Sequence, residues 1–259
     1  MTENGGMYFA DLSQDIRHGL RVLAGSPGFT SVALISLALG IAIATSAYSE
    51  MNGMILRDLP PVPNPDQLVA LQLPASYRSY KRYRDLTGVF SFTLAYRAPV
   101  PFGVSIGGHT ERTWGHLVTP SYFSTLGVRP SLGRVFDSTQ EQSPTGVVSY
   151  RFWQNHLASD ASIIGKTLRI NGHSAVVIGV GPKDFLGASP VLFVADLWMP
   201  LSTDANIAPE LAGNALERRD LTMFQIVGRL KPGISIARAE AELNVAADQM
   251  AQAGEFQAD

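Results

Sequence analysis

The organisation of the chain is determined by the stretch GSPGFTSVALISLALGIAIATSAYS at residues 25–49. Its 25 residues include no Asp, Glu, Lys, Arg or His. A helix needs about 20 apolar residues to cross the hydrocarbon core of a bilayer, where only a helix or a closed barrel satisfies the backbone. Ser26 followed by Pro27 is typical of a helix N-terminus. The stretch therefore predicts a membrane-spanning helix, with a buried core helix as the alternative.

Two kinds of membrane segment fit this stretch. A cleavable signal peptide has an apolar region of about 7–15 residues and a small-residue cleavage site, for which Ala42-Ile43-Ala44 would serve. The apolar run exceeds that length, and the residues before it are acidic as well as basic. We therefore expect an uncleaved anchor.

Residues 8–23 lead into this anchor. Apolar side chains recur there at helical spacing, which predicts an amphipathic helix lying at the membrane surface: Phe9, Leu12, Ile16, Leu20 and Leu23. Arg17 and Arg21 precede the anchor, whereas only Arg57 lies close after it. The excess of basic residues before the anchor favours a cytoplasmic N-terminus and an extracytoplasmic remainder.

Composition excludes several classes of function. The 259 residues carry a net charge of −2, so there is no electrostatic footprint for binding nucleic acid. The charged fraction of 16% is below the ~25% of an ordinary soluble domain. The chain has no cysteine, which excludes disulfides, thiolate metal sites and a cysteine nucleophile.

Beyond the anchor, four prolines between Pro60 and Pro65 predict a stiff, extended connector. Short strand and helix patterns follow without regular alternation, which favours an α+β domain. We expect strands at residues 67–73, 91–96, 100–106, 111–118, 147–150, 167–170, 174–180 and 222–230. We expect helices at residues 77–86, 120–127, 151–157 and 235–253.

Three local signals are the most specific. Asn171-Gly172 separates two β-rich runs and predicts a hairpin with a two-residue type I′ turn. Thr119 and Gly127 are expected to begin and end the short helix between them. Ser235 is expected to cap the last helix, whose predicted apolar face consists of Ile236, Ala239, Leu243, Ala246 and Met250.

No catalytic constellation is found in the sequence. It contains no G-x-x-x-x-G-K-[ST], G-x-S-x-G, H-E-x-x-H or strand-following G-x-G-x-x-G motif. His109 and His116 flank a predicted strand, seven residues apart, and would face opposite sides. Glu240 and Glu242 are two apart on a helix and would not face each other. The basic and aromatic run YRSYKRYRDL at residues 77–86 is interpreted as a solvated helix face and not as a nucleic-acid site.

Six stretches are informative when they are taken together: DLSQDIRHGLRVLAGSPGFTSVALISLALGIAIATSAYS (residues 11–49), MNGMILRDLPPVPNPDQLVAL (51–71), ERTWGHLVTPSYFSTLGVRPSLGRVF (111–136), SYRFWQNHLASDASIIGKTLRINGHSAVVIGV (149–180), DLWMPLS (196–202) and VGRLKPGISIARAEAEL (227–243). Together they resemble the MacB/FtsX-type permeases of ABC transporters, especially the bacterial orphan (ADOP) group. No single motif among them is decisive, but their order and spacing match the family.

The resemblance implies a four-helix permease of the bacterial inner membrane, with a large periplasmic domain between helices one and two. That domain would comprise a porter part and an inserted sabre part, and three further membrane helices would follow residue 259. A separate cytoplasmic ATPase would drive it, and a homodimer or a partner permease is implied. The chain itself is then no enzyme, needs no cofactor, and has no site residue that the family pattern assigns.

The expected organisation follows from both lines of argument. Residues 1–24 form a cytoplasmic amphipathic segment, 25–50 the membrane helix, 51–66 the connector, and 67–259 the MacB-like periplasmic core domain. The function expected is to couple ATPase-driven movement of the membrane helix to the extracytoplasmic domain. The alternative is a signal-anchored extracytoplasmic binding or structural module that acts without an ATPase.

Overall fold

The computed structural model describes residues 62–71, 74–86, 88–136, 144–188, 194–203 and 205–252, and four isolated positions, Gly25, Gly28, Ser31 and Ser36. The chain divides into two units, Met1–Gly53 and Met54–Asp259. The four described positions of the first unit are helical. The rest of the predicted membrane helix and all of the predicted amphipathic helix lie outside the described residues. No helix within the described residues is both long and apolar enough to span a bilayer.

Among the described residues of the second unit, nine strands form one connected sheet. They are β1 (Leu68–Ala70), β2 (Phe90–Ile106), β3 (His109–Val118), β4 (Leu132–Gly133), β5 (Thr145–Val148), β6 (Thr167–Ile170), β7 (His173–Val180), β8 (Leu197–Pro200) and β9 (Gln225–Leu230). The α-helices are α3 (Tyr77–Arg84), α4 (Tyr122–Leu126), α5 (Tyr150–His156) and α6 (Ile236–Gln252). Single turns of 3-10 helix form η1 (Pro65–Gln67), η3 (Ala161–Ile163) and η4 (Pro209–Leu211). The mixture of helices and strands confirms the predicted α+β class of this domain.

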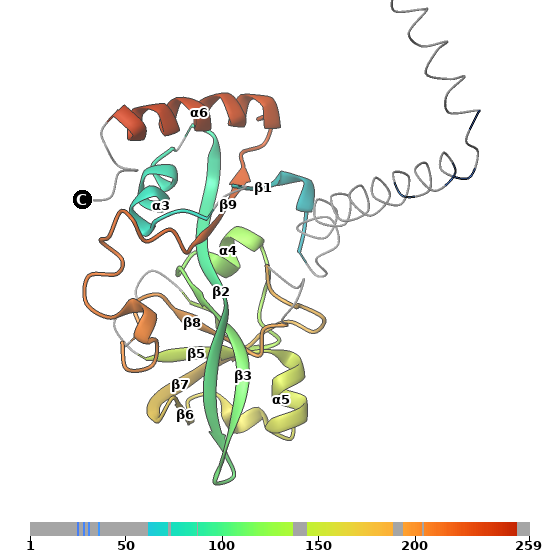
Figure 1. Ribbon diagram of the computed structural model, residues 1–259. Coiled ribbons are helices and arrows are strands. Elements are labelled where there is room, and N and C mark those ends of the chain that lie inside the picture. Colours follow the sequence, from blue (N-terminus) through green and yellow to red (C-terminus); the bar gives the residue numbers. More distant parts are fainter. Residues whose placement is uncertain are drawn as a thin grey trace, which may run out of the picture. The chain divides into compact units, whose positions relative to one another are not determined.

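Strand β2 is the spine of the domain (Figure 1). Its first half pairs with β9, from Phe90 opposite Leu230 to Tyr96 opposite Gln225. Its second half pairs with β3 and, through Val104, with β6. The sequence predicts two strands here, whereas the structure has one, with a register irregularity between Arg97 and Val100. One strand therefore belongs to both halves of the domain.

The lower half of the domain in Figure 1 is a closed ring of strands. Strand β2 pairs with β3, β3 with β8, β8 with β5, β5 with β7, β7 with β6, and β6 again with β2. The pairs β3–β8 and β5–β7 are parallel and the others antiparallel. Closure leaves these strands without free edges, as in a small barrel.

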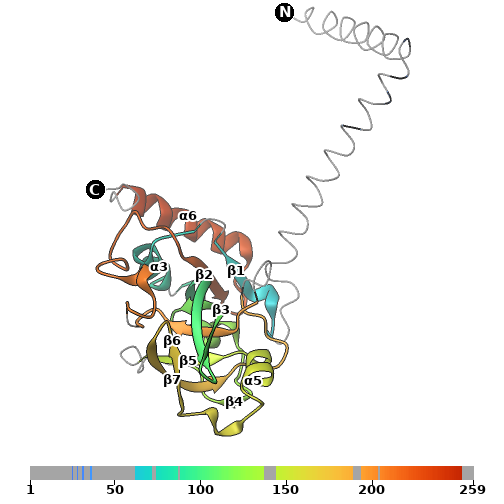
Figure 2. The ribbon, with the colours of Figure 1, turned by 60° about the horizontal axis from the view of Figure 1, so that its bottom comes forward.

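Helices cover both faces of the upper sheet, β1-β9-β2. Helices α3 and α6 pack on one face, where Tyr80, Tyr83 and Met250 join Phe224 in a buried cluster. Helix α4 packs on the other, where Tyr122 and Phe123 are completely buried. Figure 2 shows α3 and α6 on the same side of β1 and β2. The aromatic residues predicted as part of a solvated helix thus face the core, because Tyr80 and Tyr83 are one helical turn apart.

The predicted helix boundaries hold at most ends. The Ser76 hydroxyl accepts the Ser79 N–H at the start of α3, and Ser235 does the same for Arg238 at α6. Gly127 ends α4 in the left-handed conformation (φ 70°), as expected. Thr119 does not cap this helix, because its hydroxyl instead accepts the Ala95 N–H of β2.

The long helix α6 differs from its predicted face at one end. Ala239, Ala246 and Met250 are buried, and Leu243 is half-buried. Ile236, in contrast, is 53% exposed at the first position of the helix. The predicted packing of this helix on the sheet is otherwise confirmed.

Candidate functional site

The described residues form no catalytic or metal centre. They contain no group of three or more His, Asp or Glu side chains able to hold a metal ion. His109 is exposed at the β2–β3 hairpin, and His116 is buried further along β3. His156 pairs with Glu111 at 2.8 Å on the surface, and His173 is exposed.

One tripeptide resembles the end of a phosphate loop but has another role. Gly165-Lys166-Thr167 leads into strand β6, which begins at Thr167, and not into a helix. The Lys166 Nζ donates a 2.8 Å hydrogen bond to the Asp160 carboxylate, and this bond helps to hold the pKa of Asp160 well below its usual range. With a salt-bridged lysine and no helix N-terminus, the loop lacks the geometry that cradles phosphate.

The buried His116 lies in a cage of aromatic side chains. Its ring stacks on Tyr96 at a centroid distance of 5.7 Å and meets Tyr122 and Trp198 edge to face, each at 6.4 Å. Burial lowers the pKa of His116 to about 3, so its imidazole is neutral at physiological pH. A neutral, enclosed imidazole serves packing and leaves no route to a substrate.

Two tyrosines of this cage hold the segment that follows β7. The Ala188 N–H donates to the Tyr122 hydroxyl at 2.8 Å, and the Tyr96 hydroxyl donates to the Ala188 carbonyl at 3.3 Å. Gly187 lies against the imidazole, and a Cβ there would come within 2.8 Å of the His116 Cε1. The cage therefore attaches this segment to α4 and to β2.

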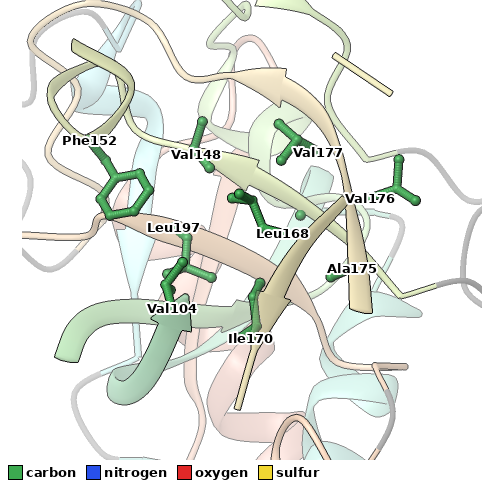
Figure 3. A pocket seen from close by; sticks show the side chains of 10 residues that line it. Val104, Val148, Phe152, Leu168, Ile170, Ala175, Val176, Val177 and Leu197 are labelled. Atoms are coloured by element: carbon green, nitrogen blue, oxygen red, sulfur yellow. The ribbon is translucent and has the colours of Figure 1, made fainter. Parts of the chain in front are cut away.

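The interior of the strand ring is filled. Figure 3 shows Val104, Phe152, Ile170 and Leu197 directed into it from different elements. The cavity that remains has a volume of about 10 Å³, room for at most about one water, and its lining is apolar. The ring is a packed core and not a ligand chamber.

A much larger hollow opens between α3, β1 and α6, which we call the α3–α6 groove. Its volume is about 860 Å³. It is lined by Val69 of β1 and Leu71 just after it, by Ser79 and Tyr83 of α3, and by Leu243 and Ala247 of α6. Polar side chains line it as well, among them Asp220, Glu240 and Asn244, so the groove is both apolar and polar.

The connector is joined to the domain by one guanidinium group. Arg229 of β9 donates from Nε to the Thr125 carbonyl at 2.7 Å and from Nη2 to the Leu126 carbonyl at 3.1 Å. Its Nη1 donates to the Asn64 carbonyl and to the Gln67 side chain, each at 3.3 Å. Partial burial lowers the pKa of Arg229 from its ordinary value, yet the group stays charged.

Apolar packing also holds the connector at this place. Val62 is buried in the cluster beneath α4, and Pro63 lies against Gly127, where a Cβ would come within 2.9 Å of the proline ring. A cation at the end of a helix also interacts favourably with the exposed carbonyls there. The chain that leaves the predicted membrane helix is thus attached to β9 and α4 at once. Sequence reasoning missed Arg229, because a lone arginine in a strand gives no motif; only its contacts identify it.

Comparisons with known proteins agree on one family. The model of the MacB-like periplasmic core domain matches residues 30–246. No curated protein matches the sequence. Among solved structures, the periplasmic region of MacB from Actinobacillus actinomycetemcomitans superposes with a TM-score of 0.51 at 14% identity, covering 72% of this chain and 86% of that one.

A second solved structure gives the same result. The extracellular domain of the noncanonic ABC-type transporter YknZ from Gram-positive bacteria superposes with a TM-score of 0.52 at 12% identity. It covers 73% of this chain and 88% of that one. At such identities the likeness concerns the fold.

Proposed function

Because the chain belongs to the MacB-like periplasmic core domain family, we propose that it transmits movement between a membrane helix and an extracytoplasmic domain of an ABC-type permease. The chain is the MacB-like periplasmic domain of such a permease. In the proposed arrangement residues 25–50 anchor it in the inner membrane with the N-terminus in the cytoplasm. A separate cytoplasmic ATPase supplies the energy, and the permease works as a homodimer or with a partner permease.

The observation that carries this proposal is the set of hydrogen bonds that Arg229 makes to the connector and to α4, which we call the Arg229 joint. Its guanidinium donates to the connector at Asn64 and to the end of α4 at Thr125. Arg229 itself lies in β9, which pairs with the spine strand β2. A displacement of the connector would therefore act on the sheet and on α4 together, not on a loose tether. This rigid attachment is what mechanical transmission requires.

The sequence contains no phosphate-binding loop, which supports the assignment of ATP hydrolysis to a separate subunit. ATP hydrolysis is accordingly assigned to the partner subunit.

Reporter fusions test the topology. Alkaline phosphatase inserted at the exposed Lys231-Pro232-Gly233 turn should be active in intact cells, since this enzyme needs export. The same fusion lacking residues 25–50 is the matched control and should be inactive. The anchored fusion should stay in the membrane pellet after carbonate washing. Activity of a cytoplasmic reporter at this turn would reverse the orientation.

Purification from native membranes tests the partner. A tagged chain should copurify with a subunit that carries a phosphate-binding loop and hydrolyses ATP. Recovery without any such subunit would contradict the permease proposal and favour the anchored module without an ATPase.

A further inference from the structure

A polar hollow lies between the first turn of α3 and the segment that joins η4 to β9, and we call it the arginine pocket. Its volume is about 480 Å³. Figure 1 shows this segment passing beside α3. Every side chain that lines the pocket is charged or an amide: Arg78, Asn214, Glu217, Arg218, Arg219 and Asp220. The pocket is therefore opposite in character to the apolar cavity inside the strand ring.

The wall of the pocket that faces α3 is held in place. The N–H groups of Glu217 and Arg218 donate to the Asn214 carbonyl at 2.8 and 3.1 Å, which forms a single turn. Ala215 within this turn is only 6% exposed, so apolar packing anchors it. Lys81 of α3 pairs with the Glu217 carboxylate at 2.9 Å and so joins the two walls. A pocket with fixed walls loses little conformational entropy when a ligand enters it.

Both carboxylates of the pocket already have basic partners. Asp220 accepts hydrogen bonds from Nε of Arg218 at 3.0 Å and from its Nη2. Glu217 accepts from Lys81, and this bond lowers the pKa of Glu217, with a smaller contribution from the charge of Arg78. With Lys81 included, four basic groups and two carboxylates surround the pocket, so its net charge is +2. The net charge of the whole chain is −2, so the pocket is a local concentration of positive charge.

Arg78 is the basic side chain of the pocket whose donors are available to a ligand. Among the residues that the structure describes, it makes no hydrogen bond and no ion pair, although it is only partly exposed. Arg84, later in the same helix, pairs instead with Asp85 at 3.2 Å. A guanidinium group presents five N–H donors in a planar fork that matches the oxygens of a phosphate. Arg78 can therefore bind such a group without breaking an existing hydrogen bond.

We propose that the arginine pocket binds an oxyanion of the phosphate class, held by Arg78 and Arg219, with the side-chain amide of Asn214 as a further donor. Hydrogen bonds between charged groups are the strong ones, and paired guanidinium groups are suited to phosphate oxygens. The group is carried either by free phosphate or by the headgroup of an anionic lipid, since the recognised chemistry is the same. The site does not depend on the proposed transmission of movement or on an ATPase.

Calorimetric titration of the full chain with inorganic phosphate, in a neutral maltoside detergent at constant ionic strength, tests the site. Arg78→Gln should weaken binding at least about tenfold, because it removes hydrogen bonds between charged groups. Arg78→Lys retains the charge and should weaken binding less. The matched control Arg84→Gln removes the same charge from the same helix, outside the pocket lining, and should bind as the unchanged chain does. An equal loss in Arg78→Gln and Arg84→Gln would overturn the proposal, because only the overall charge would then matter.

A second titration separates the two sources of the phosphate group. Micelles of the same detergent are doped with phosphatidic acid or, as the control, with the same proportion of phosphatidylcholine. If a lipid headgroup is the ligand, the phosphatidic acid micelles should bind more tightly than inorganic phosphate, and Arg78→Gln should lose this binding. If free phosphate is the ligand, the two kinds of micelle should bind alike. Unchanged thermal midpoints would show that the variants are folded, and no binding of either probe to the folded chain would overturn the proposal.

Discussion

The side-chain carbonyl of Asn171 accepts a 2.7 Å hydrogen bond from the Gly103 N–H, and so links the β6–β7 turn to the spine strand β2. The Asn171 N–H in turn donates to the Gly103 carbonyl at 2.7 Å. Its side-chain amide donates to the Ile207 carbonyl, also at 2.7 Å. One turn residue thus closes the strand ring and fastens a distant loop to it.

The first prediction concerns this closure. Asn171 has a positive φ of 51°, so Asn171→Gly preserves the turn while it removes both side-chain hydrogen bonds. Each such bond contributes about 0.5–1.5 kcal/mol, so the free energy of unfolding should fall by about 1–2 kcal/mol. Urea unfolding of residues 60–259 measures it. The control Asp184→Gly, at an exposed position with φ 65°, should change stability by less than about 0.5 kcal/mol. Equal midpoints for the two variants would contradict a closing role for Asn171.

The sequence predicted the β6–β7 hairpin but not the hydrogen bonds that join its turn to β2. Asn171-Gly172 reports a local backbone preference, and both residues have the expected positive φ. The pairing of this turn with Gly103 joins residues 68 positions apart, which no local pattern records. Strand β8 was missed for a related reason: it pairs in parallel with β3, and both its faces are buried, so Leu197–Pro200 shows no alternation. Most helix ends and the hairpin turn depend on neighbouring residues, so the sequence could predict them. The groove and the Arg229 joint depend on contacts between residues far apart in the chain, so it could not.

The second prediction concerns the Arg229 joint. Arg229→Met keeps the aliphatic stem but removes the donors to the Thr125 and Leu126 carbonyls. Hydrogen bonds from a charged group are worth about 1.5–3 kcal/mol, so stability should fall by about that amount. The peptide covering residues 62–68 should also exchange faster. Arg169→Met, which removes one exposed bond to the Gly172 carbonyl, should cost less than about 1 kcal/mol and leave that peptide unchanged. Unaltered exchange in Arg229→Met would show that packing alone holds the connector.

The third prediction is a pH dependence of stability from His116. Burial lowers the pKa of His116 to about 3 in the folded chain, against an ordinary value of 6.5 for the unfolded chain. Between these values the unfolded chain binds a proton that the folded chain does not. The free energy of unfolding should therefore fall as pH falls below 6.5, by up to about 1.4 kcal/mol per unit from this group.

Variants of two histidines separate this contribution from others. His116→Leu should have a shallower slope of stability between pH 6.5 and 4.5, whatever its stability at pH 7. His109→Leu, at the exposed hairpin, should keep the slope of the unchanged chain. Denaturant unfolding at four pH values measures both, and identical slopes for the two variants would show that the buried imidazole does not titrate on unfolding.

The last prediction concerns the packing of α6. Met250 is 3% exposed and packs in the cluster with Tyr80 and Phe224, so Met250→Ala should cost about 2–4 kcal/mol through lost transfer energy and a residual cavity. Leu243 touches two clusters but stands beside the α3–α6 groove and is only half-buried. Its truncation removes fewer buried contacts, and Leu243→Ala should cost about 1–2 kcal/mol. Gln249→Ala, on the exposed side of the same helix, should cost less than about 0.5 kcal/mol.

The order Met250, Leu243, Gln249 follows from burial alone, because all three variants gain the same helix propensity of alanine within a few tenths of a kcal/mol. Chemical denaturation of the three proteins decides: a Leu243 effect as large as that of Met250 would mean that the groove is closed in solution, and no effect at either position would mean that α6 does not pack on the sheet.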